Sequence, residues 1–104
     1  MATSPTQLTL KKLREDGYLC QVVEHWNQFA RIRQDLFGFI DVIGVKEGET
    51  IAVQATSYSN MSSRVNKIAE HDNVSMVRKA GWKIEVWGWH KKDNRWVVKI
   101  NDIS

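Results

Sequence analysis

The spacing of hydrophobic residues changes along this chain from one typical of helices to one typical of strands. Residues 4–16 predict a helix, because Ser4 and Gln7 form a capping box and Gly17 supplies the glycine on which helices often end. Apolar residues three and four positions apart predict two further helices, at residues 60–72 and 74–80.

Runs of β-branched and aromatic residues between the helical segments predict five strands. They are expected at residues 18–26, 36–45, 50–56, 82–90 and 95–100, with residues 27–34 as a polar connection. The second and third runs are apolar on both faces, as in central strands covered on both sides. This order of elements predicts a single α/β domain over residues 1–104, with a mixed sheet flanked by helices.

Composition narrows the class of protein only modestly. The chain has 104 residues, of which 42% are hydrophobic and 26% charged, as in an ordinary globular domain. Lys and Arg number 15 against 12 for Asp and Glu, which permits nucleic-acid binding without requiring it. No apolar run approaches the roughly 20 residues needed to cross a bilayer, and residues 1–7 lack the features of a signal peptide. We therefore expect a cytoplasmic protein without a membrane partner.

Three polar residues interrupt the predicted apolar strands, and they are the main candidates for a functional site. Asp41 lies within the run FIDVI, and Gln54 and Thr56 lie two positions apart in the next strand. Burying an unpaired carboxylate or amide is costly, so such residues usually have a partner or a role. Mg²⁺ prefers hard oxygen ligands, which Asp41, the Gln54 amide and the Ala55 carbonyl could supply. The structural alternative is that Gln54 and Thr56 only bond to neighbouring strands.

The runs FIDVI at residues 39–43 and AVQATS at residues 52–57 resemble the PD-(D/E)XK nuclease superfamily, and most closely its small Holliday-junction-resolvase-like and VRR-NUC-like members. That superfamily has an α-β-β-β-α-β core, with an Asp in the second strand and a (Glu/Gln)-x-Lys motif in the third. The resemblance covers residues 8–90. It implies a restriction-endonuclease-like fold with an added C-terminal strand, and a Mg²⁺- or Mn²⁺-dependent DNA endonuclease. Branched DNA as the substrate and a homodimer are further expectations from the resemblance.

Two positions depart from the superfamily pattern. Gln54 stands where a Glu is usual, and Thr56 stands where the lysine is expected. Threonine cannot supply the positive charge that would stabilise a phosphate transition state. Thr56 is expected to lie beside the attacking water, and Arg64 or Lys67, in the helix that follows, is expected to supply the positive charge instead. The alternative is a site that has lost catalysis and only binds DNA.

Further ligands and phosphate contacts are expected around these residues. Asp35, just before the second strand, and Glu24, at the end of the first, are candidate metal ligands. Phosphate contacts are expected from polar residues before and after the two central strands: Arg31, Arg33, Asn60, Arg64 and Lys67. For each basic residue the alternative is a solvated charged surface.

The tryptophans near the end of the chain offer a rival function. Trp87 and Trp89 lie in the predicted strand at residues 82–90. Exposed indoles there would favour a small protein-interaction protein, whereas buried indoles would be core residues.

Overall fold

Helices and strands follow one another through residues 3–104, the part of the chain that the computed structural model describes. The elements in chain order are α1 (Pro5–Glu15), β1 (Leu19–Val22), β2 (His25–Asn27), β3 (Ile32–Gln34), β4 (Val42–Lys46), β5 (Glu49–Ser57), the 3-10 turn η1 (Tyr58–Asn60), α2 (Met61–Ala69), α3 (Val74–Lys79), β6 (Lys83–Lys92) and β7 (Arg95–Asp102). Of residues 1–7, which lack the features of a signal peptide, residues 1–2 lie outside the described part of the chain.

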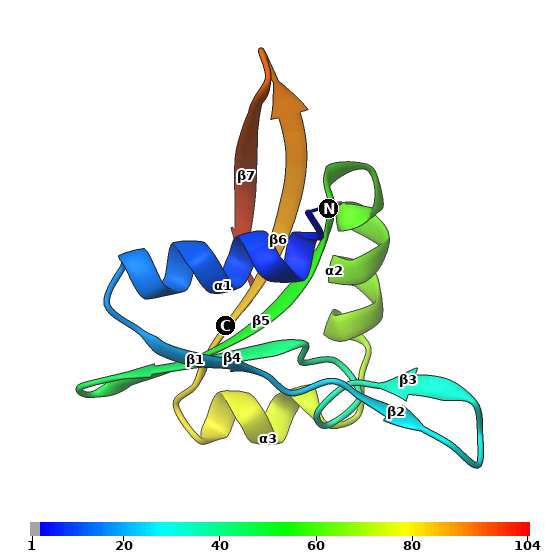
Figure 1. Cartoon of the computed structure of the whole chain (residues 1–104). Coiled ribbons are helices and arrows are strands. Elements are labelled where there is room, and N and C mark those ends of the chain that lie inside the picture. Colours follow the sequence, from blue (N-terminus) through cyan, green and yellow to red (C-terminus); the bar gives the residue numbers. More distant parts are fainter. Residues whose placement is uncertain (1–2) are drawn as a thin grey trace.

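A five-stranded mixed sheet forms the centre of the fold, as predicted. Its strand order is β1-β4-β5-β6-β7, and every neighbouring pair is antiparallel except β5 and β6. The parallel pair needs a crossover, which η1, α2 and α3 provide. β2 and β3 pair with each other and form a hairpin that projects away from the main sheet (Figure 1).

The helix α1 covers one face of the sheet. Its N-cap is the predicted one, since the Ser4 side chain accepts a hydrogen bond from the backbone N–H of Gln7 at 3.2 Å. The core on this face joins α1 to β4, β5 and β6 through Leu10, Leu13, Val42, Ile51, Val53, Trp87 and Trp89. A buried hydrogen bond of 2.9 Å from Trp89 Nε1 to Thr9 Oγ1 also links helix and sheet.

The helices α2 and α3 cover the opposite face. Their core residues are Phe39, Ile40, Ala52, Met61, Ile68, Val74, Val77, Ile84 and Val86. Gly88 of β6 allows the close approach of α2, because a Cβ there would lie 2.8 Å from Met61 Sδ. Side chains alternate along β5, so Gln54 and Thr56 share the face of Ala52 and α2.

The strand predicted at residues 36–45 is wrong over its first half. β4 begins only at Val42, and the preceding segment folds into a tight turn closed by a bridge between Leu36 and Ile40. Phe37 and Gly38 have positive φ angles of 55° and 89°, which a strand does not permit. The apolar pattern misled the prediction because the turn still delivers buried residues to the core.

The first predicted strand and the polar connection after it are also corrected. Residues 18–26 divide into β1 and β2, and the connection at residues 27–34 contains β3. The side chain of Asn27 accepts hydrogen bonds from the backbone N–H groups of Phe29 and Ala30, both at 3.0 Å. This turn closes the β2–β3 hairpin.

The tryptophans of β6 are core residues. Trp87 and Trp89 are 2% and 7% exposed, so the rival reading of a tryptophan-rich contact surface on β6 loses its main support. Within residues 3–104, no helix combines the length and the apolar character that crossing a bilayer requires.

Candidate metal centre

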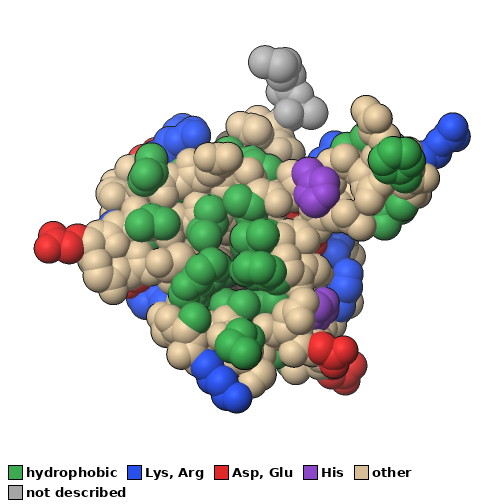
Figure 2. All heavy atoms as spheres, turned by 90° about the horizontal axis from the view of Figure 1, so that it is seen from below, with side chains coloured by type: hydrophobic (Ala, Val, Ile, Leu, Met, Phe, Trp, Pro, Cys, Tyr) green, Lys and Arg blue, Asp and Glu red, His purple; other side chains and the backbone are tan. Residues whose placement is uncertain are grey.

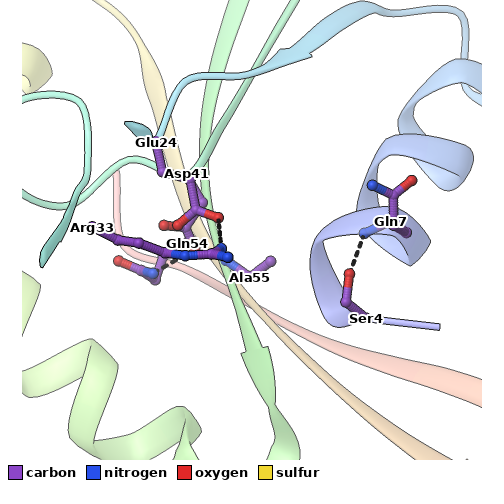
Figure 3. A network of polar contacts seen from close by, with 7 residues as sticks. All are labelled: Ser4, Gln7, Glu24, Arg33, Asp41, Gln54 and Ala55. Carbon is purple, nitrogen blue, oxygen red and sulfur yellow. Dashed lines mark hydrogen bonds and ion pairs between the residues drawn. The ribbon is translucent and has the colours of Figure 1, made fainter. Parts of the chain in front are cut away.

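The predicted pair Asp41 and Gln54 meets at the start of β4. Val42 and Val53 are partners in the β4–β5 ladder, and Asp41 and Gln54 are the next residues along each strand. Gln54 Nε2 donates a 2.6 Å hydrogen bond to Asp41 Oδ2, and the backbone N–H of Ala55 donates to the same oxygen at 3.0 Å (Figure 3). Both side chains are buried, with exposed fractions of 4% and 6%. The ladder therefore fixes the position of the carboxylate.

Two further carboxylates converge on Asp41. Carboxylate oxygens of Glu24, Asp35 and Asp41 all lie within 4.8 Å of one another. The Val23 N–H donates to the Asp41 carbonyl at 2.8 Å, which brings the neighbouring Glu24 to the site. The structure thus joins three of the predicted metal ligands, which come from segments 17 residues apart at most. We call this set the acidic cluster.

The position of Asp35 follows from the turn after β3. The Leu36 N–H donates to the Ile40 carbonyl at 2.9 Å, and the Gly38 N–H donates to the Asp35 carbonyl at 3.0 Å. These bonds fold the chain back on itself directly before Asp41. The turn that replaces the predicted strand is therefore what places Asp35 against Asp41.

The acidic cluster perturbs the titration of its most buried member. Burial raises the pKa of Asp41 to about 8, and a hydrogen bond and charge repulsion from Asp35 add to the effect. Repulsion from Glu24 acts in the same direction, whereas the hydrogen bond from the Ala55 N–H opposes it. At neutral pH the Asp41 carboxyl therefore holds a proton unless another positive charge takes its place.

One cation belongs to the acidic cluster. Arg33 Nη1 forms an ion pair of 3.2 Å with Glu24 Oε1, while 73% of the Arg33 side chain remains exposed. If all three carboxyls are ionised, Arg33 leaves two negative charges uncompensated. A divalent cation would match that charge, and carboxylate oxygens are the ligands that hard cations prefer. The cluster could therefore hold a metal ion.

The roles of Gln54 and Ala55 differ from the simplest expectation. In this structure the nitrogen of the Gln54 amide faces Asp41, so its oxygen points away from that carboxylate. Ala55 reaches Asp41 through its N–H. Both residues hold Asp41 in place. Their predicted roles as metal ligands through the amide oxygen and the backbone carbonyl stay predictions.

The other predicted catalytic residues lie on β5 and α2, and within residues 3–104 no side-chain hydrogen bond or ion pair joins them to the acidic cluster. Thr56 is buried, with an exposed fraction of 6%, and follows Gln54 on the same face of β5. On α2, Arg64 is half-buried and Lys67 is exposed, and neither forms an ion pair within residues 3–104. Their predicted role as the missing cation stays a prediction.

Two predicted DNA contacts lie in turns. Arg31 lies in the turn between β2 and β3 with a positive φ of 54°, and it is exposed. Asn60 occupies the N-cap position of α2, where its carbonyl accepts a hydrogen bond from Ser63 Oγ at 3.0 Å. Both are placed on the surface by local turn geometry.

The pairing of Arg33 with Glu24 was missed by the sequence analysis. The polar pattern of residues 27–34 predicts a connection, in which Arg33 is expected only as a phosphate contact. The signal that could have revealed the pairing is Asn27, a residue typical of turns, between two short β-like runs. A hairpin there brings Glu24 and Arg33 to the same end of two paired strands.

Comparison with protein-family models, with curated proteins and with solved structures finds no match for this chain.

Proposed function

We propose that this protein is a metal-dependent DNA endonuclease with a restriction-endonuclease-like fold, and that the acidic cluster is its metal site. The observation that carries the proposal is the buried Asp41, held by Gln54 and Ala55 and facing Asp35 and Glu24. The order of a helix, strands, a helix and a parallel strand supports the fold assignment.

The residues present fit Mg²⁺ or Mn²⁺. Three carboxylates supply hard oxygen ligands, and burial together with the neighbouring Asp35 raises the pKa of Asp41, so that a bound cation would favour its ionised form. When bound, such an ion would activate a water molecule and neutralise charge that develops on the phosphate. Asp41, Asp35 and Glu24 would hold the ion, while Gln54 orients Asp41 through its hydrogen bond.

Arg33 is the residue we propose to contact the DNA phosphate beside the acidic cluster. Its guanidinium is paired with Glu24 at one nitrogen and is otherwise largely exposed, so donors remain free for a phosphate oxygen. Arg64 and Lys67 of α2 are the further cations proposed to compensate for Thr56. The positive charge that stabilises the phosphate would then come from residues outside β5.

The test is cleavage of a labelled four-way junction and of a matched linear duplex, with Mg²⁺, Mn²⁺ or EDTA. We expect cleavage that requires the metal, with the junction preferred. Binding without cleavage in any metal would replace the nuclease by the second candidate, a DNA-binding module on the same fold. Thr56 is the observation that favours this second candidate, because it leaves β5 without the cation of the superfamily motif. The absence of both binding and cleavage would contradict both candidate functions.

The expected homodimer has a candidate surface on the face that carries α3. Hydrophobic side chains gather at the centre of this face (Figure 2). Met76 and Phe37 are 70% and 48% exposed, and they border a depression of about 240 Å³ that Trp82 also lines. An exposed apolar patch of this kind is typical of a contact surface. We propose that a second copy of the chain packs here.

Met76→Lys is expected to convert such a dimer into a monomer, because it places a charge in the apolar contact. Light scattering coupled to size-exclusion chromatography at micromolar concentration measures the mass. Ser75→Lys is the matched control, since Ser75 is an exposed neighbour on α3 and the charge change is the same. A monomeric wild type, or equal loss of mass in both variants, would contradict the proposed contact.

A further inference from the structure

A groove runs between α1 and the β6–β7 hairpin, on the face of the sheet opposite Gln54 and Thr56. The helix α1 crosses the base of this hairpin (Figure 1). The groove has a volume of about 530 Å³ and is lined by Leu8, Lys11, Lys12, Glu15, Trp89, Arg95, Trp96, Val97 and Val98. Its floor is rigid, because Trp89 is buried and bonded to Thr9 of α1 at 2.9 Å.

The charge on the walls of the groove is positive. Lys11 and Lys12 come from α1 and Arg95 comes from β7, against the single carboxylate of Glu15. Lys12 is engaged with Asp16 at 3.6 Å, whereas Lys11 and Arg95 form no ion pair within residues 3–104. Two unpaired cations on opposite walls are suited to an anionic chain that follows the groove.

An exposed indole lines the same groove. Trp96 is 40% exposed although Trp87 and Trp89, on the neighbouring strand, are buried. Lys91 Nζ lies 5.4 Å from the centre of the Trp96 ring, so another cation accompanies the aromatic surface. A large apolar side chain that remains exposed at a basic groove is the arrangement on which unpaired bases stack.

We propose that this groove binds single-stranded nucleic acid, with Trp96 stacking on a base and Lys11 and Arg95 contacting phosphates on either side. The partner is single-stranded because a base within a duplex already stacks on its neighbours and offers no free face to an indole. The groove lies apart from the acidic cluster, so this inference does not depend on the proposed nuclease activity. It adds a surface that would hold an unpaired strand of a branched substrate.

The test is fluorescence anisotropy with a labelled 12-residue oligothymidylate, in EDTA and over a range of NaCl concentrations. Trp96→Ala is expected to weaken binding roughly 5- to 100-fold, the loss typical of one stacked base. Trp96→Phe keeps an aromatic face and is expected to restore most of the affinity. Lys11→Ala is expected to reduce the slope of log K against log salt by about 0.7, the value for one phosphate of a single strand.

Matched controls lie outside the groove. Phe29→Ala removes another exposed aromatic side chain, in the turn between β2 and β3, and Lys79→Ala removes another exposed lysine of a helix. Equal losses in Trp96→Ala and Phe29→Ala would overturn the proposal, and so would a 12-base-pair duplex bound as tightly as the single strand. Circular dichroism verifies folding of each variant, and the salt slope of Lys11→Ala still decides if Trp96→Ala does not fold. Because EDTA prevents metal-dependent cleavage, failure of the nuclease proposal leaves this result unaffected.

Discussion

Asp41→Asn is expected to abolish metal-dependent cleavage and, at the same time, to stabilise the metal-free protein. Removing a carboxylate that holds the metal should lower the cleavage rate by roughly 1,000-fold, as expected when charge stabilisation in a phosphate transition state is lost. The free energy of unfolding should instead rise, because the buried Asp41 carboxylate faces the carboxylates of Asp35 and Glu24. A change in both properties with opposite signs would mark Asp41 as a functional residue.

The stability gain follows from the contacts of the carboxylate. An asparagine keeps an oxygen that accepts the bonds from Gln54 Nε2 and the Ala55 N–H. Its amide nitrogen donates toward Asp35, where two carboxyls would otherwise face each other. In EDTA at pH 8 we expect the free energy of unfolding to rise by about 1–2 kcal/mol. Urea denaturation followed by tryptophan fluorescence measures it.

Asp72→Asn is the matched control, because Asp72 is exposed and the substitution removes the same charge. It should leave both cleavage and stability unchanged. Cleavage retained in Asp41→Asn would remove the acidic cluster from the proposed function. A loss of stability in EDTA would instead assign the Asp41 carboxylate a structural role.

Part of the acidic cluster was predictable, because a polar residue is easily recognised where it interrupts the apolar pattern of a buried strand. Asp41 and Gln54 stood out within apolar runs, and the hairpin between β4 and β5 then pairs them by register. Helix α1 was equally predictable, since its N-cap pattern is local in sequence. In each case the information lies within one element or in two neighbouring strands.

The rest of the cluster depends on geometry that the apolar pattern hides. Phe39 and Ile40 are buried, with exposed fractions of 2% and 0%, which is why their run resembled a strand. The positive φ angles of Phe37 and Gly38 are set by the turn, and hydrophobicity does not report them. Asp35 approaches Asp41 because of this turn, and Glu24 because the neighbouring Val23 N–H donates to the Asp41 carbonyl. Burial and backbone direction are independent properties, and the sequence pattern reports the first better than the second.

The affinity for Mg²⁺ is expected to rise steeply with pH. Since the pKa of Asp41 is about 8 in the metal-free protein, a bound ion must displace a proton below that pH. The apparent dissociation constant should therefore fall by about tenfold per pH unit from pH 6 to pH 8 and level off above. Isothermal titration calorimetry in two buffers of different ionisation enthalpy measures both the affinity and the proton release, which should be close to one per site at pH 6.5.

The titration of Asp41 also determines whether the metal-free protein becomes more or less stable as the pH rises. The folded protein keeps a proton on Asp41 that the unfolded chain, with a pKa of 3.8, has already released. The free energy of unfolding in EDTA should therefore fall as the pH rises from about 4 to about 8 and then become constant. Mg²⁺ should offset this loss progressively above pH 6, and neither trend should occur in Asp41→Asn. An affinity for Mg²⁺ that does not change between pH 6 and pH 8 would show that the ion binds without Asp41, and the acidic cluster would then not be the metal site.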